Sequence, residues 1–113
     1  MRRSQRLRQR QEFDAVYRRG KPFRTDLLIM RALQTQEPLS RFGFTVSKAV
    51  GNAVVRNRVR RRMKDAARSL PVAPGWDIVF NSRKPAAEAS FAQIREQMGS
   101  ALGRAGLLEE ASK

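Results

Sequence analysis

A turn followed by a basic amphipathic segment constrains this chain more than any other feature. Gly51-Asn52 is a chain-reversal signal, and Asn is a good helix N-cap. No Pro or Gly occurs from Ala53 to Leu70, so about five helical turns fit at about 3.6 residues per turn. Apolar residues recur there at helical spacing and form a narrow stripe: Val55, Val59, Met63, Ala66, Ala67 and Leu70. The sequence therefore predicts a helix that packs one side against a core.

The other sides of this helix carry cations. Arg56, Arg60 and Lys64 form one row, and Asn57, Arg61 and Arg68 form another. Asp65 is the only acidic residue in the segment, although an ordinary surface helix mixes both charge signs to gain ion pairs. Arg offers a planar fork of donors that suits phosphate oxygens. This pattern favours a polyanionic partner over the alternative, a solvated helix of an ordinary basic protein.

Composition narrows the class of protein. The chain has 113 residues, 24 Lys and Arg against 10 Asp and Glu, and a net charge of +14. We interpret residues 1–113 as a single nucleic-acid-binding domain, with an anionic membrane surface as the weaker option. Cys and His are absent, which excludes thiolate and His-ligated metal sites and Ser-His catalysis. No apolar run approaches the roughly 20 residues of a membrane span. We expect a soluble, cytoplasmic protein.

The predicted elements follow the order α-β-β-α-β-α. Besides the basic helix, we expect helices over 9–19 and 90–108 and strands over 27–33, 41–47 and 76–82, with Arg31 interrupting the first strand. The strand 76–82 is apolar enough to lie centrally. Residues 1–8 form a loose basic arm, and residues 109–113 form a frayed tail. The fold class is α/β, an α+β sandwich in which helices pack on a mixed sheet, with a right-handed crossover as the default.

Aromatic residues beside cations suggest a second RNA contact. Phe13 and Tyr17 lie four residues apart on the first helix, near Arg10, so bases could stack on the rings while phosphates meet Arg. The alternative is that both rings belong to the core, although the hydroxyl of Tyr17 favours partial exposure. Phe42 and Phe44 resemble ring pairs that stack bases, with a core role as the stronger alternative. The turn 83–85 is either a further phosphate contact or a solvated loop.

Residues 46–61 strongly resemble the signature of the bacterial ribonuclease P protein subunit, Lys-x-x-Gly-Asn-Ala-Val-x-Arg-Asn-Arg-x-Lys-Arg-x-x-Arg. The spacing of Phe13, Val16, Tyr17 and Gly20 and the run 83–86 extend this resemblance over nearly the whole chain. Arg60 stands where Lys is usual, and Lys64 stands where Arg is usual. Charge is kept at both positions, but a forked contact at Lys64 would be lost.

The resemblance implies an unusual left-handed crossover around the basic helix. It also implies that the protein binds a large catalytic RNA, and we predict that the protein is monomeric. This RNA uses Mg²⁺ to remove the 5′ leader of precursor tRNA. We expect that RNA to hold the Mg²⁺, with no catalytic residue and no DNA or membrane partner for this chain. The residues that we assign to the catalytic RNA are Lys48, Asn52, Arg56, Asn57, Arg58, Arg60, Arg61, Lys64 and Arg68. Those that we assign to a leader-binding cleft between the first helix and the sheet are Phe13, Tyr17, Arg10, Phe44, Arg83 and Lys84.

Three other functions fit parts of the pattern. A ribosomal or ribosome-assembly protein shares the charge and size, but would not require the long signature. A DNA-binding module would read base edges from one helix face, usually as a dimer. A stand-alone nuclease is disfavoured because the acidic residues are scattered and no pair suits acid/base or two-metal chemistry.

Overall fold

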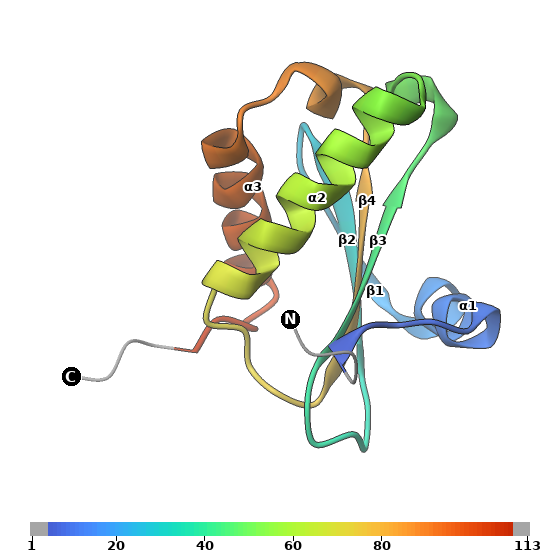
Figure 1. Cartoon of the computed structure of the whole chain (residues 1–113). Helices are drawn as coiled ribbons and strands as arrows, with labels where there is room; N and C mark the ends of the chain where they lie inside the picture. The colour runs from blue at the N-terminus through green and yellow to red at the C-terminus, as the bar shows by residue number, and fades with distance from the viewer. Residues whose placement is uncertain (1–4, 110–113) are drawn as a thin grey trace.

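A computed structural model describes residues 5–109 and shows a four-stranded sheet between helices (Figure 1). The elements in chain order are α1 Arg10–Arg19, β1 Lys21–Arg24, β2 Leu28–Gln34, β3 Arg41–Val46, the short 3-10 helix η2 Lys48–Val50, α2 Ala53–Ser69, β4 Trp76–Ser82, the short 3-10 helix η3 Lys84–Glu88 and α3 Phe91–Arg104.

The sheet is mixed, as predicted. Its strand order is β1-β2-β4-β3, and β4 occupies an interior position, as its apolar sequence indicated. β2 pairs with β1 and β4 in antiparallel fashion, and β3 pairs with β4 in parallel. Helix α2 connects these two parallel strands. The connection has the left-handed sense that the family resemblance implied, against the general preference for right-handed crossovers (Figure 1).

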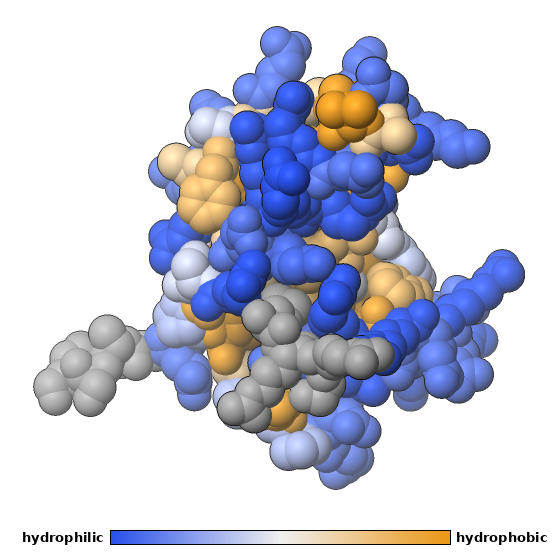
Figure 2. Space-filling view, viewed as in Figure 1, coloured by the Kyte–Doolittle hydropathy of each residue, from blue (hydrophilic) through white to orange (hydrophobic). Residues whose placement is uncertain are grey.

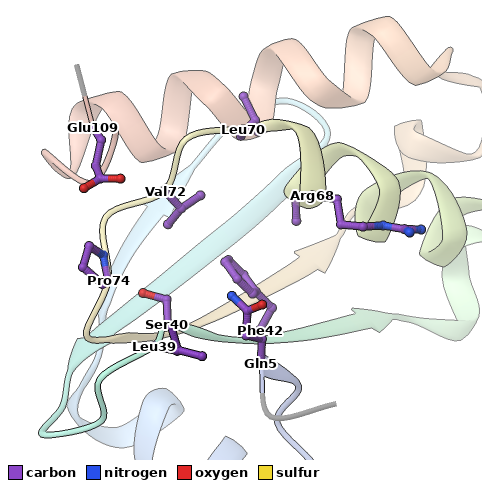
Figure 3. A pocket seen from close by; sticks show the side chains of 10 residues that line it. Gln5, Leu39, Ser40, Phe42, Arg68, Leu70, Val72, Pro74 and Glu109 are labelled. Atoms are coloured by element: carbon purple, nitrogen blue, oxygen red, sulfur yellow. The ribbon is translucent and has the colours of Figure 1, made fainter. Parts of the chain in front are cut away.

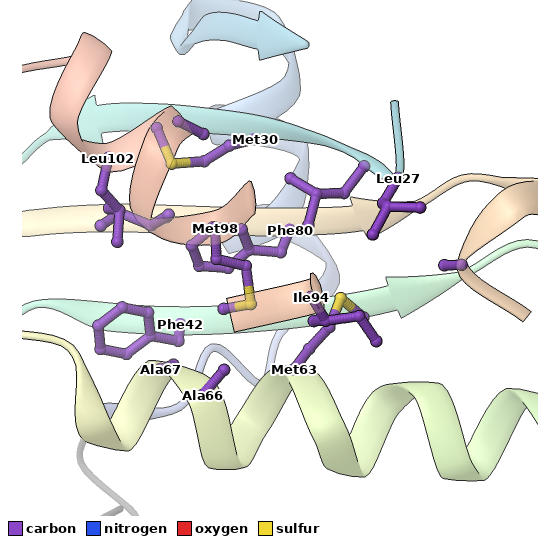
Figure 4. Close-up of a cluster of buried hydrophobic side chains, with 14 of the residues drawn as sticks. Leu27, Met30, Phe42, Met63, Ala66, Ala67, Phe80, Ile94, Met98 and Leu102 are labelled. Atoms are coloured by element: carbon purple, nitrogen blue, oxygen red, sulfur yellow. The ribbon is translucent and has the colours of Figure 1, made fainter. Parts of the chain in front are cut away.

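The helices divide between the two faces of the sheet. Helices α2 and α3 cover one face, and α1 lies alone on the other (Figure 1). The main core lies between the sheet and the α2/α3 layer, where Met63 from α2 and Met98 from α3 are both fully buried with Phe80 from β4 (Figure 4). The apolar stripe predicted for α2 is the side that packs into this core.

A smaller core joins α1 to the opposite face. Leu7, Val16 and Val79 are buried together, and the half-buried side chains of Phe13 and Leu33 pack against them. Leu7 also donates its backbone N–H to the carbonyl of Phe42 at 2.8 Å. The prediction of a loose arm is therefore wrong for residues 5–8, while residues 1–4 lie outside the described part of the chain.

Two further predictions need correction. The predicted element order lacks β1, an edge strand of four residues. Its sequence, Lys-Pro-Phe-Arg, gives only a weak indication of a strand because Pro lacks an amide donor. Helix α3 ends at Arg104 instead of residue 108, because Gly106 adopts a φ of 74° and Leu107 turns back to become buried. Glu109 donates its backbone N–H to Pro71 at 2.7 Å, and residues 110–113 are outside the described range.

Among residues 5–109, no helix combines the length and the apolar character that crossing a membrane requires.

Candidate nucleic-acid interface

Helix α2 places cations on its outermost side and on both flanks, and these three sides differ in their surroundings. The outermost side carries Asn57, Arg61 and Arg68, all exposed, while Arg56, Arg60 and Lys64 form a half-buried row along one flank. Figure 2 shows hydrophilic residues over much of the molecular face on which α2 lies. Asn57 accepts a hydrogen bond from Arg60 at 2.8 Å, and Arg68 pairs with Asp65 at 2.6 Å. Within the described residues, Arg61 has neither a hydrogen bond nor an ion pair from its side chain.

The other flank of α2 uses its arginines to hold neighbouring backbone. Arg58 donates from Nη2 to the carbonyl oxygen of Ala87 at 3.1 Å, and Arg62 donates from Nη1 to that of Ala89 at 2.7 Å. Both guanidinium-bearing residues are half-buried, and their acceptors lie in and after η3. Arg58 thus has a structural contact on the α3 side of the helix, in addition to the role in RNA binding that we predicted for it.

Two predicted contacts precede the helix. Asn52 is the N-cap of α2, as expected, because its Oδ1 accepts the backbone N–H of Val55 at 3.0 Å. Its side-chain NH₂ group remains a potential donor. Lys48 is exposed in η2. The turn before α2 therefore extends the line of polar and cationic groups beyond the N-terminal end of the helix.

The second surface is the sheet face on which α1 lies. Tyr17 is 38% exposed, which confirms its predicted partial exposure, and its hydroxyl lies 3.5 Å from Thr45 Oγ1 of β3. The guanidinium of Arg31 from β2 lies 5.1 Å from the centre of the Tyr17 ring, a cation–π arrangement. Arg10 is exposed at the start of α1. An aromatic ring and a cation without an ion-pair partner in residues 5–109 thus meet on this face.

Phe13, the other aromatic residue on α1, has a packing role. Its ring fills the space above Gly43, where an added Cβ would lie only 2.3 Å from Phe13 Cε1. Glycine at this position of β3 therefore lets α1 approach the sheet closely. The sequence left two alternatives for Phe13, a core residue or part of a binding surface. The structure supports the first, because most of this side chain packs in the smaller core.

An ion-pair network fastens the start of α1 to the sheet. Arg41 donates to both carboxylate oxygens of Asp77, at 2.8 and 2.7 Å, and to Glu12 Oε2 at 2.9 Å. Glu12 Oε1 also accepts the backbone N–H groups of Gln9 and Arg8. These backbone hydrogen bonds and the Arg41 charge hold the pKa of the Glu12 carboxyl below its usual value. The bond to Asp77 raises the pKa of Arg41. The network fixes where α1, and hence Tyr17, lies on the sheet.

Phe44 does not belong to this surface, and its assignment to the leader cleft is corrected. Side chains alternate along β3, so Phe44 points to the face opposite Gly43 and Thr45. There its ring stacks on Phe80 with a centroid separation of 6.1 Å and packs against the main core. A ring beneath α2 cannot line a cleft beside α1.

The turn after β4 has a structural contact of its own. Arg83 is half-buried and donates from Nη1 to the carbonyl oxygen of Thr25 at 3.0 Å, which ties the end of β4 to the β1–β2 turn. Lys84 begins η3 and is exposed. Their assignment to leader binding stays a prediction.

Strand pairing adds residues that sequence reasoning missed. Ile29, Asn81 and Thr45 are aligned across β2, β4 and β3 on the α1 face, close to Tyr17 and Arg31. The one available signal was Arg31, a cation within an otherwise apolar strand. Nothing in the local sequence indicates on which face of the sheet the Asn81 side chain lies.

A hollow of about 600 Å³ lies beside the C-terminal end of α2 (Figure 3). Its sides include Phe42, Leu70 and Val72, and Arg68 is its only member from the predicted RNA-binding set. The Ser40 hydroxyl within it is already satisfied, because it donates to the carbonyl of Ala73 at 2.6 Å and accepts the N–H of Trp76 at 3.1 Å. Apart from Arg68, the hollow therefore shares no residue with either candidate RNA surface.

The described residues bring together no group of three or more Asp and Glu side chains suited to holding a metal ion. Glu12 and Asp77 are joined through Arg41, whose donors occupy both carboxylate oxygens of Asp77 and Glu12 Oε2.

Comparisons with known proteins agree on one family. Residues 1–106 match the family described as Ribonuclease P. The ribonuclease P protein component of Roseiflexus castenholzii (strain DSM 13941 / HLO8) is 42% identical over 114 residues, covering 98% of this chain and 93% of that protein. The component from Dehalococcoides mccartyi (strain ATCC BAA-2266 / KCTC 15142 / 195) is 38% identical, covering 100% of this chain and 94% of its own.

Solved structures show the same fold. The RNase P protein from Thermotoga maritima has a TM-score of 0.80 and 27% identity, covering 88% of this chain and 96% of its own. The RNase P protein of Staphylococcus aureus has a TM-score of 0.83 and 23% identity, covering 93% of this chain and 98% of its own. At that identity, the second likeness concerns the fold alone.

Proposed function

The chain belongs to the ribonuclease P protein family, and from this premise we propose that it binds a catalytic RNA through α2 and the single-stranded 5′ leader of precursor tRNA through the α1 face. In this proposal the protein assists cleavage, while the RNA and its Mg²⁺ carry out the chemistry. The observation that best supports the proposal is that this small protein has two surfaces suited to binding RNA, on opposite faces of its sheet (Figure 1).

The outer side of α2 suits a structured RNA. Arg61 is exposed and without a side-chain partner among residues 5–109, and the neighbouring row of Arg56, Arg60 and Lys64 adds three further cations. Contacts of this kind neutralise phosphates and release counterions, so they supply affinity that falls with salt. They carry little base information, which fits recognition of an RNA by its shape.

The α1 face suits a single strand. A base can stack on the exposed part of the Tyr17 ring while a phosphate meets Arg31, and such contacts tolerate most sequences. Mature tRNA lacks the leader, so these contacts favour substrate over product. The cations on the opposite face offset the repulsion between two polyanionic RNAs, and we expect this to lower the Mg²⁺ concentration needed for activity.

The division of labour follows from the side chains. The chain has no His and no Cys, and its described carboxylates do not gather into a metal site. Mg²⁺ is therefore expected on the RNA. The pure protein should not cleave precursor tRNA with Mg²⁺ alone, and adding the catalytic RNA at low Mg²⁺ should restore cleavage. Cleavage at the leader junction by an RNA-free preparation would contradict this assignment.

The leader contact is tested with Tyr17→Ala in the reconstituted holoenzyme. Loss of one stacking contact costs roughly 1 to 3 kcal/mol, so affinity for precursor tRNA should fall about fivefold to over a hundredfold. Affinity for mature tRNA should stay unchanged. Tyr17→Phe is the matched control, because it keeps the ring and loses only the hydroxyl near Thr45. A lower melting temperature with an unchanged precursor-to-mature affinity ratio would show that Tyr17 serves packing and not the leader.

A further inference from the structure

One row of side chains crosses the open part of the α1 face. Strand register aligns Arg24, Ile29, Asn81 and Thr45, one from each strand, and directly opposed residues point to the same face. None of the four is buried, whereas Gly43 and Val79 in the next row, beneath α1, are. The row is therefore accessible sheet surface at the side of Tyr17, whose hydroxyl reaches Thr45.

Asn81 stands out within this row. It lies on the interior strand β4, where packing favours apolar or β-branched residues and Asn is depleted. Its side chain is half-buried and makes no hydrogen bond to another side chain or backbone group in residues 5–109. The amide has an acceptor oxygen and two N–H donors side by side. Neither packing nor an internal hydrogen bond explains this residue at the centre of the face.

The groups around Asn81 match the parts of one nucleotide. Thr45 is its direct neighbour on β3, one strand spacing or about 4.8 Å away, and links it to Tyr17. Ile29 is its neighbour on β2, and Arg31 is two residues further along that strand on the same face. A ring for stacking, a cation for phosphate and a free amide are thus within one small area.

We propose that Asn81 reads the edge of one nucleobase in the single-stranded leader, while Tyr17 stacks on that base or its neighbour and Arg31 contacts phosphate. This inference rests on the proposed leader binding and adds base discrimination to it. Asn forms paired donor and acceptor hydrogen bonds with base edges, and a paired contact of this kind discriminates between bases. The leader is then read at one nucleotide, and the rest of it is bound without regard to sequence.

The test measures holoenzyme binding to precursor tRNAs that differ at single leader positions, with all four bases at each position. We expect one position at which affinities differ by about fivefold or more, and Asn81→Ala should remove this difference. Asn81→Val is a second variant that lacks the amide and suits a strand, so a folding defect in the first would not obscure the result. Gln36→Ala, which removes an exposed amide from the β2–β3 turn, is the matched control and should keep the preference.

The outcomes separate this inference from the function on which it rests. If the wild type binds all four bases equally at every position, or if the preference survives in both Asn81 variants, Asn81 does not read the leader. Tyr17→Ala would then still weaken precursor binding if the leader uses this face. If Tyr17→Ala also leaves precursor affinity unchanged, leader binding at the α1 face is itself wrong.

Discussion

Two adjacent arginines on α2 allow a direct separation of RNA contact from structural support. Arg61 is exposed, and its side chain has no partner among residues 5–109, whereas Arg62 is half-buried and donates to the carbonyl of Ala89 at 2.7 Å. Replacing either by Ala removes the same charge from the same helix and favours helix formation equally. Any difference between the two variants therefore arises from where each guanidinium lies.

The expected effects follow from those positions. One lost phosphate contact lowers the slope of log affinity against log salt by about 0.7 to 0.9, which at about 0.1 M salt amounts to a five- to eightfold loss of affinity. Arg61→Ala should show this loss with a melting temperature close to the wild type. Arg62→Ala loses a hydrogen bond from a charged donor, worth about 1.5 kcal/mol when half-exposed, and should melt about 4–8 °C lower.

Thermal melting and binding of the catalytic RNA at several salt concentrations measure both effects on the same preparations. Equal loss of affinity and an equal change of slope in the two variants would show that only net charge matters, and that the outer side of α2 is not a specific contact. Normal affinity of Arg61→Ala at all salt concentrations would mean that this side of the helix is merely solvated.

Two further predictions concern the attachment of α1. Gly43→Ala places a Cβ 2.3 Å from Phe13 Cε1, so the ring must move and the free energy of unfolding should fall by about 1–3 kcal/mol in urea titrations; an unchanged midpoint would mean that α1 is not held closely at this position. Glu12 has a lowered pKa in the folded state, so its contribution to stability is complete above pH of about 4.5 and is lost as pH falls through the folded value. Glu12→Gln should therefore reduce the loss of stability between neutral and acidic pH, and an unchanged pH profile would contradict the role of the Arg41 network.

The α2 region could be read from the sequence because its signals are local. Helix periodicity, an Asn cap and the absence of Pro and Gly act over a few residues, so the helix and its apolar stripe were predicted correctly. The exposure of Tyr17 and the interior position of β4 were also predicted, because a phenol hydroxyl and a strand with a continuous apolar centre each have few favourable environments. The family signature lies in the same local segment.

The composition of each face of the sheet was decided by tertiary structure alone. Strand residues alternate between faces, so an adjacent position or a one-residue change of register reverses the assignment of every side chain. Phe44 was placed beside α1 by sequence and lies under α2 instead, while Arg31, Thr45 and Asn81 are brought to Tyr17 by pairing between strands far apart in the chain. The sequence by itself determined the three helices, the strands β2, β3 and β4, and where the charge is concentrated. Only the pairing of β2, β4 and β3 under α1 determined which residues form the second surface, because that pairing is a long-range choice that no local pattern specifies.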